Sequence, residues 1–290
     1  MTHCNSRKDI SLVILAAGLG RRFGGEKQLA TVGKSGKPLM YYSVMDAWEV
    51  GIRKMVLIVN SIIEPVIRRS FLPMLPGDLE VSLLCQETDD LPAGCPTVPR
   101  QKPWGTGHAL WCARGAVDAA CIVMNADDYY GADTIGCLAK HLERSEDWAM
   151  VSYALENTLS GFGAVNRGLC QVEDGFLLGV KECLEIKQDH DGIHGVLDGR
   201  PVTLEPDKPV SMNIWAFDRR VFGRLENGLG RFIRDTRIDN GAEYYLPMQV
   251  MSDIESGEAH VRVFPSREAW YGITYREDLA RIGDIFDARD

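Results

Sequence analysis

Short apolar runs alternate with helical patterns along the first half of the chain. Four of these runs have the length of buried strands: 11–16, 54–60, 80–85 and 120–125. Helical spacing or helix-compatible composition occurs between them, at 38–50, 62–71 and 105–118. This alternation of strands and helices predicts an α/β protein with a mixed, mostly parallel sheet and helices on both faces.

Beyond residue 145, strand-like runs follow one another with few helices between them: 148–154, 163–172, 177–186 and 210–217. The polar, glycine-containing segment 187–208 predicts a hairpin or a mobile loop. Helical patterns return at 218–226, 242–255 and 278–287. Because no repeat, low-complexity tract or linker interrupts the pattern, we expect residues 1–290 to form a single domain with two halves, about 10–147 and 148–290.

Composition narrows the class of protein. The net charge of −9 argues against a general nucleic-acid surface, and no apolar stretch reaches the ~20 residues of a membrane span. The eight cysteines contain no C-x-x-C pair, which argues against a zinc site. The first nine residues are polar without a signal-peptide pattern, so we expect a protein of the reducing cytoplasm.

The segment 15–29 carries the strongest functional signal, because four glycines and three cations follow the first predicted strand together. Glycines let backbone N–H groups approach a ligand closely, and arginine and lysine neutralise phosphate charge. The pair Asp127-Asp128 follows the strand 120–125. Ligands of parallel sheets bind beyond the carboxyl ends of the strands, so both features are expected at one nucleotide site.

The spacing Gly18-x-Gly20-x-x-x-Gly24 by itself is a weak indication of a dinucleotide site. Such a site also needs an acidic residue after the second strand, where this chain has Asn60 and nothing acidic before Glu64. A nicotinamide dehydrogenase is therefore a distant alternative.

The motif Leu15-Ala-Ala-Gly-Leu-Gly-Arg-Arg-Phe23 with Lys27 resembles the signature of nucleotidyltransferases that activate sugar phosphates. Further segments resemble motifs of that family in the expected order: Gln86, Lys102–Leu110, Asn125–Asp128, Ser160–Val165 and Ser211–Phe217. The resemblance implies the Rossmann-like fold of these enzymes, which is similar to the GT-A fold, with a nucleotide-binding half followed by an acceptor-binding half. It also implies attack of an acceptor phosphate on the α-phosphorus of an NTP, with release of pyrophosphate.

The resemblance assigns catalytic roles to Arg22 and Lys27, which would stabilise the triphosphate, and to Asp127, which would bind Mg²⁺. Other residues would contact the nucleotide: Leu15, Ala16, Ala17, Gly18, Gly20, Arg21, Gln86, Gly105 and Thr106. Gln86 and the Gly105 segment suit a small base, which favours UTP or CTP.

Relatives carry a second metal-binding carboxylate late in the chain, but Trp270-Tyr-Gly-Ile-Thr274 has none at that place, so Glu243 is the substitute candidate. The acceptor residues implied are Asp128, Gly163, Lys181, Glu182 and Asn213. Relatives often have Glu-Lys-Pro where this chain has Lys181-Glu182-Cys183, which leaves the identity of the acceptor open.

We therefore expect a Mg²⁺-dependent nucleotidyltransferase that acts on an NTP and a phosphorylated small molecule, with a sugar 1-phosphate favoured. Neither nucleic acid nor a membrane is expected as a partner, and a homo-oligomer is left open. Two alternatives remain: a glycosyltransferase of similar fold that uses a nucleotide sugar, and a non-catalytic regulatory subunit, which the missing late carboxylate suggests.

Overall fold

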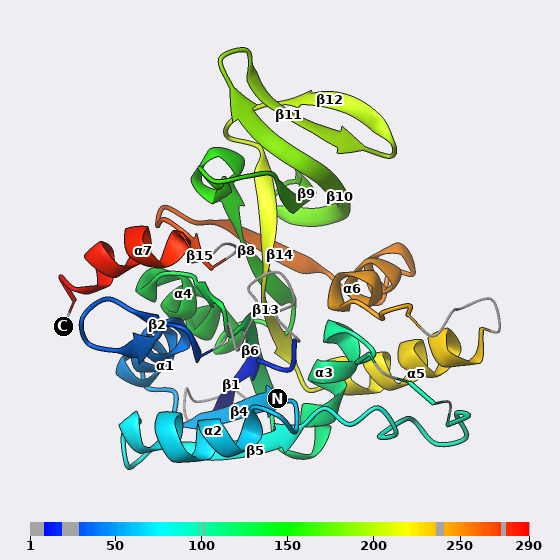
Figure 1. Ribbon diagram of the computed structural model, residues 1–290. Coiled ribbons are helices and arrows are strands. Elements are labelled where there is room, and N and C mark those ends of the chain that lie inside the picture. Colours follow the sequence, from blue (N-terminus) through cyan, green and yellow to red (C-terminus); the bar gives the residue numbers. More distant parts are fainter. Residues whose placement is uncertain are drawn as a thin grey trace.

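The computed structural model describes residues 9–18, 29–97, 99–100, 102–235, 241–273 and 277–289. Its main element is an 11-stranded sheet with the order β12-β11-β10-β14-β8-β13-β6-β1-β4-β5, in which β9 pairs with β10 and β13 (Figure 1). The strands are β1 (Ile10–Leu15), β4 (Lys54–Val59), β5 (Glu80–Cys85), β6 (Ala120–Asn125), β8 (Trp148–Ala154), β9 (Val165–Glu173), β10 (Phe176–Asp189), β11 (Gly192–Leu197), β12 (Arg200–Leu204), β13 (Pro209–Asp218) and β14 (Val261–Pro265). Two small sheets pair β2 (Thr31–Val32) with β3 (Lys37–Pro38), and β7 (Asp128–Tyr129) with β15 (Tyr271–Gly272).

The direction of the strands divides the sheet into two parts. Strands β5, β4, β1 and β6 are parallel neighbours, so their carboxyl ends meet at one edge. Strand β13 is antiparallel to both β6 and β8. The pairs β9–β10, β10–β11 and β11–β12 are also antiparallel, whereas β14 is parallel to β8. The predicted mostly parallel sheet thus describes the first half, and the sheet as a whole is mixed.

Helices cover both faces of the sheet because the side chains of its central strands alternate between two apolar layers. Leu12 and Ile14 of β1 pack in the layer that contains α1 and α4, whereas Val13 and Leu15 pack in the layer that contains α3, α5 and α6. The helical elements are α1 (Leu39–Glu49), α2 (Glu64–Val66), η3 (Ile67–Phe71), η4 (Leu72–Met74), α3 (Thr106–Cys112), η5 (Ala113–Gly115), α4 (Ala132–Leu142), η6 (Leu155–Thr158), α5 (Arg220–Arg234), α6 (Leu246–Glu255) and α7 (Asp278–Phe286).

Helix α4 and strand β14 are among the elements that were not predicted. Helix α4 buries Ile135, Leu138, Ala139 and Leu142, which have the i, i+3, i+4, i+7 spacing of an amphipathic helix. Strand β14 is a short run between polar segments, and its pairing with β8 decides its conformation. The segment 187–208 contains the end of β10 with β11 and β12, and these strands form hairpins that project from the rest of the sheet (Figure 1).

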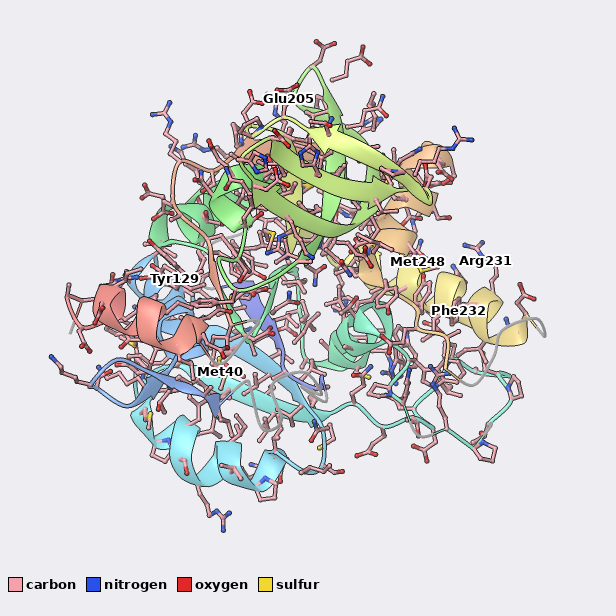
Figure 2. The ribbon with its side chains drawn as sticks, turned by 45° about the horizontal axis from the view of Figure 1, so that its top comes forward. Met40, Tyr129, Glu205, Arg231, Phe232 and Met248 are labelled. Carbon is pink, nitrogen blue, oxygen red and sulfur yellow. The ribbon has the colours of Figure 1, made fainter. Side chains whose placement is uncertain are left out.

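Helix α7 packs on the side of the molecule away from α5, where a third apolar cluster holds it (Figure 1). Phe286 packs against Tyr42 of α1, with ring centroids 4.4 Å apart, and against Tyr129 of β7 at 4.9 Å. Figure 2 shows Tyr129 beside α7, far from Phe232 of α5 on the other side of the molecule. The C-terminal helix is therefore held against the strand that contains Asp128.

Candidate functional site

The loop that follows β1 is held between the ends of β4 and β6. The amide of Ala16 donates to the carbonyl of Ile58 at 2.7 Å, and the amide of Ala126 donates to the carbonyl of Leu15 at 3.1 Å. The side chain of Asn60 donates to the carbonyl of Ala17 at 3.2 Å. The start of the glycine segment therefore lies at the carboxyl edge of the parallel strands, as expected.

The structure describes this segment only up to Gly18. Gly20, Arg21, Arg22 and Lys27 lie outside the described residues, so the roles assigned to them remain predictions from the sequence.

On the β5 side of this edge, Gln86 contacts the segment that begins α3. Its backbone amide donates to the carbonyl of Val59 at 2.8 Å, which continues the pairing of β5 with β4. Its side-chain Nε2 lies 3.0 Å from the carbonyl oxygen of Gly105 and 3.0 Å from Nδ1 of His108. Two residues predicted to contact the nucleotide, Gln86 and Gly105, are thus brought together.

Gly105 and Thr106 are fixed by a later part of the chain. Gly105 has φ of +94°, and a β-carbon there would lie 2.8 Å from the carbonyl oxygen of Tyr244, so only glycine fits. The hydroxyl of Thr106 accepts a hydrogen bond from the amide of Leu246 at 2.9 Å. No local pattern in the sequence indicates this contact, because 140 residues separate Thr106 from Leu246.

Two acidic residues follow β6, and their environments differ. Asp128 is buried, and its Oδ2 accepts hydrogen bonds from Nδ2 of Asn125 at 2.9 Å and from the hydroxyl of Tyr130 at 3.1 Å. Asp127 is half-buried, and its carbonyl accepts a hydrogen bond from the amide of Ile273 at 3.1 Å. Asp127 lies in the turn between β6 and β7, whereas Asp128 is the first residue of β7.

Asn213, predicted on the acceptor side, joins the same network. Its Nδ2 donates to Oδ1 of Asn125 at 2.8 Å, and its Oδ1 accepts from the indole of Trp215 at 2.9 Å. The structure therefore connects Asn213 to Asp128 through Asn125. Asn125 belongs to the predicted Asn125–Asp128 motif, but no role of its own was predicted for it.

The other acceptor candidates, Glu182, Lys181 and Gly163, have different environments. Burial of its carboxylate raises the pKa of Glu182, although part of the residue is exposed, and Arg167 opposes the shift. Lys181, by contrast, is exposed and pairs with Asp198 at 3.1 Å. Consecutive residues of a strand face opposite sides, so the side chains of Lys181 and Glu182 point to opposite faces of β10, and their roles toward an acceptor remain predictions. Gly163 lies in the bend that precedes β9.

Arg167 of β9 was not predicted as a site residue, and it lies near Asp128 and Glu182. Its guanidinium donates to Oγ1 of Thr158 at 3.2 Å and lies 5.0 Å from the ring centroid of Trp270. Burial lowers its pKa to about 10, while Asp128 and Glu182 raise it. Nothing in the sequence around this arginine indicated such an environment.

Glu243, the substitute candidate for the second metal ligand, lies beside Tyr245. Burial raises the pKa of Tyr245, and a hydrogen bond with Glu243 and the charge of Glu182 raise it further. Glu243 is therefore grouped with Tyr245 and Glu182. Its role as a metal ligand remains a prediction from the sequence.

The profile of the MobA-like NTP transferase domain matches residues 12–226, which is more than half of the chain. The chain therefore belongs to this family of NTP transferases. The match covers the glycine segment 15–29, the segment Lys102–Leu110 and the Asn125–Asp128 motif, whose order along the chain predicted such a family.

Solved structures support the fold. The inositol-1-phosphate CTP transferase of T. maritima superposes with a TM-score of 0.62 over 96% of this chain and 93% of that chain, at 12% sequence identity. A protein of Bacillus anthracis named as a glucose-1-phosphate thymidylyltransferase, in complex with a sucrose, gives 0.62 over 97% and 96%, at 14% identity. No curated protein matches the sequence significantly. Among the described residues, no helix combines the length and apolar character needed to cross a bilayer.

Proposed function

We propose that this protein transfers a nucleoside monophosphate from an NTP to a phosphomonoester and releases pyrophosphate. The observation that carries the proposal is the convergence of three segments on the carboxyl edge of the parallel strands: Ala16–Gly18 after β1, Gln86 after β5 and Asp127 after β6. This edge is where ligands bind in parallel sheets. UTP or CTP is the proposed donor, and a sugar 1-phosphate is the proposed acceptor.

The acidic groups fit Mg²⁺, which prefers hard oxygen ligands and keeps several water molecules. We assign Asp127 as the protein ligand, because Asp128 already accepts hydrogen bonds from Asn125 and Tyr130. A carboxylate at position 272 has no room, since a β-carbon there would meet Trp270 and Asp128. When bound, the metal would supply positive charge at the α-phosphate.

The side chains of the chain supply the remaining electrostatics in this proposal. Attack of one phosphate on another brings two anions together, so cations between them stabilise the transition state. Arg22 and Lys27 are assigned this role from the sequence. Asn213 holds Asn125, which in turn donates to Asp128, so this network would keep the acidic edge rigid. No general base is needed, because the attacking phosphate is already ionised.

The test is pyrophosphate release with each of the four NTPs, Mg²⁺, and pooled sugar and alcohol phosphates. Asp127→Asn and Lys27→Ala should each reduce turnover by roughly 100-fold or more, because each removes electrostatic stabilisation of the transition state. Lys34→Ala is the matched control, because the Lys34 side chain is 93% exposed and should leave turnover unchanged.

The other outcomes each favour a different function. Absence of pyrophosphate with every NTP and acceptor would contradict the proposal. Sugar transfer from a nucleotide sugar without pyrophosphate would instead indicate a glycosyltransferase. Tight NTP binding without turnover would indicate a regulatory subunit.

A further inference from the structure

His108, on the first turn of α3, forms a hydrogen-bonded link between the segment after β5 and Gln86. It is completely buried, and its Nε2 lies 2.7 Å from the backbone carbonyl oxygen of Asp90. A carbonyl oxygen only accepts hydrogen bonds, so Nε2 must carry the proton. In the neutral ring Nδ1 is then an acceptor, and it lies 3.0 Å from Nε2 of Gln86.

The neutral ring is the form that this environment favours. Burial lowers the pKa of His108, and the charges of Arg114 and Arg100 lower it further, while Asp90 raises it. The position of Asp90 is itself fixed, because Arg114 binds its two carboxylate oxygens at 2.8 and 3.0 Å. Arg114 in turn lies 3.5 Å from the ring centroid of Trp111. His108 therefore presents its acceptor from a rigid position.

This arrangement uses both amide hydrogens of Gln86. One points to Nδ1 of His108 and the other to the carbonyl oxygen of Gly105, each at 3.0 Å. If the amide were flipped, its oxygen would face these two acceptors and both hydrogen bonds would be lost. The orientation of the Gln86 amide is thus determined by its neighbours.

The remaining polar atom of this side chain is Oε1. Gln86 is 8% exposed, and Oε1 accepts no hydrogen bond from the part of the chain that the structure describes. Oε1 is nevertheless not completely shielded from solvent. Gln86 follows β5 at the edge where the proposed nucleotide site lies. A fixed hydrogen-bond acceptor is therefore available to a ligand.

We propose that His108 is a positioning residue for base selection, which holds Gln86 so that Oε1, and not the amide N–H groups, faces the nucleobase. The base must then offer an N–H group at this point, such as the amino group of cytosine or the ring N–H of uracil. Without the acceptor at Nδ1, the amide can rotate and can accept or donate. The discrimination between bases should then decrease, because the wrong pattern no longer leaves a polar group unpaired.

Two substitutions separate the functions of the two ring nitrogens. His108→Asn keeps an acceptor near the position of Nδ1, whereas His108→Gln keeps a donor near Nε2 for Asp90 and has no polar atom at the position of Nδ1. Cys112→Ala is the matched control, since its Sγ lies 3.7 Å from Nε2 of His108 on the same helix. Dissociation constants of the four NTPs are measured by calorimetry for each variant, and circular dichroism verifies folding.

The expected result is a change in the ratio of dissociation constants between the preferred NTP and the next one. His108→Gln should reduce this ratio about tenfold, while His108→Asn and Cys112→Ala should leave it within about twofold. An equal loss of affinity for all four NTPs, with the ratio unchanged, would show a purely structural role and overturn the proposal. A wild-type protein that binds all four NTPs equally would also overturn it.

A measurement on the unmodified protein covers the case in which His108→Gln does not fold. Long-range ¹H–¹⁵N correlation spectra report which ring nitrogen carries the proton, and the proposal requires Nε2–H. A proton on Nδ1 would contradict it.

The inference rests on the proposed function only in that an NTP is the ligand. Selective NTP binding without pyrophosphate release would contradict catalysis and leave the role of His108 intact.

Discussion

Gly272 lies directly opposite Asp128 in the two-stranded sheet of β7 and β15. A β-carbon at Gly272 would lie 2.7 Å from Oδ1 of Asp128 and would overlap the ring of Trp270. At position 272 an indole and the neighbouring carboxylate therefore fill the space that a side chain would need.

Replacing Gly272 with alanine should destabilise the protein. The added methyl group must displace the buried indole of Trp270 or the carboxylate of Asp128, which corresponds to overpacking and costs roughly 1–3 kcal/mol. The free energy of unfolding in urea measures this loss. Gly223→Ala is the control, because nothing lies within 4 Å of a β-carbon there and alanine favours the helix by up to about 1 kcal/mol. Equal stability of Gly272→Ala and wild type would contradict the packing argument.

Asn213 has a left-handed backbone, with φ of +62°, and two side-chain hydrogen bonds, to Asn125 and from Trp215. Asn213→Gly should lose the hydrogen bonds only, whereas Asn213→Ala should also strain the backbone. We expect the alanine variant to be less stable than the glycine variant by about 1 kcal/mol. Chemical denaturation of the two variants measures the difference in stability. A more stable alanine variant would contradict the predicted backbone strain.

Arg289 fixes the C-terminal end of the chain to α1. It donates to Asp46 at 2.7 Å, and Asp46, only 2% exposed, also accepts from the hydroxyl of Tyr129 at 2.7 Å. Arg289→Gln should cost about 2 kcal/mol, because it leaves a buried carboxylate with fewer donors, although the arginine is partly exposed. The double variant with Asp46→Asn should lose less than the sum of the two single changes. Additive losses in thermal unfolding would exclude a direct coupling.

The stability of the protein should depend on the ionisation of His108. Its pKa is lowered in the folded state, so below the ordinary value near 6.5 the unfolded chain binds more protons. The free energy of unfolding should therefore be fully maintained above pH 6.5 and should fall as the pH decreases from there toward the lowered pKa. His108→Asn lacks this group, so the difference between the two proteins should shrink or reverse over that range. A constant difference would contradict the prediction.

Much of the fold could be predicted because local pattern and long-range packing agree. The strands β1, β4, β5 and β6 are continuous apolar runs, since both faces of each strand are covered. The helix α4 could have been found from the spacing of its buried residues. Strand β14 could not, because a run of five residues becomes a strand only through its neighbour β8.

The candidate site shows the same division. The sequence by itself determined that a glycine segment, Gln86 and Asp127 come to one edge, because each follows a strand of the same direction. It could not determine that Glu182 lies opposite Gly168 and Lys181 opposite Leu169 of β9, which depends on strand register.

Only the tertiary structure decided how the polar groups are oriented. Arg167, Asn125 and His108 obtain their environments from partners far along the chain, such as Trp270, Asn213 and Gln86. A hydrogen bond is directional and short, so its partners are known only when the backbone is placed. Hydrophobic burial is not directional, and its period can be read along the chain. For this reason the sequence determined which segments converge, and the fold decided which atoms face a ligand.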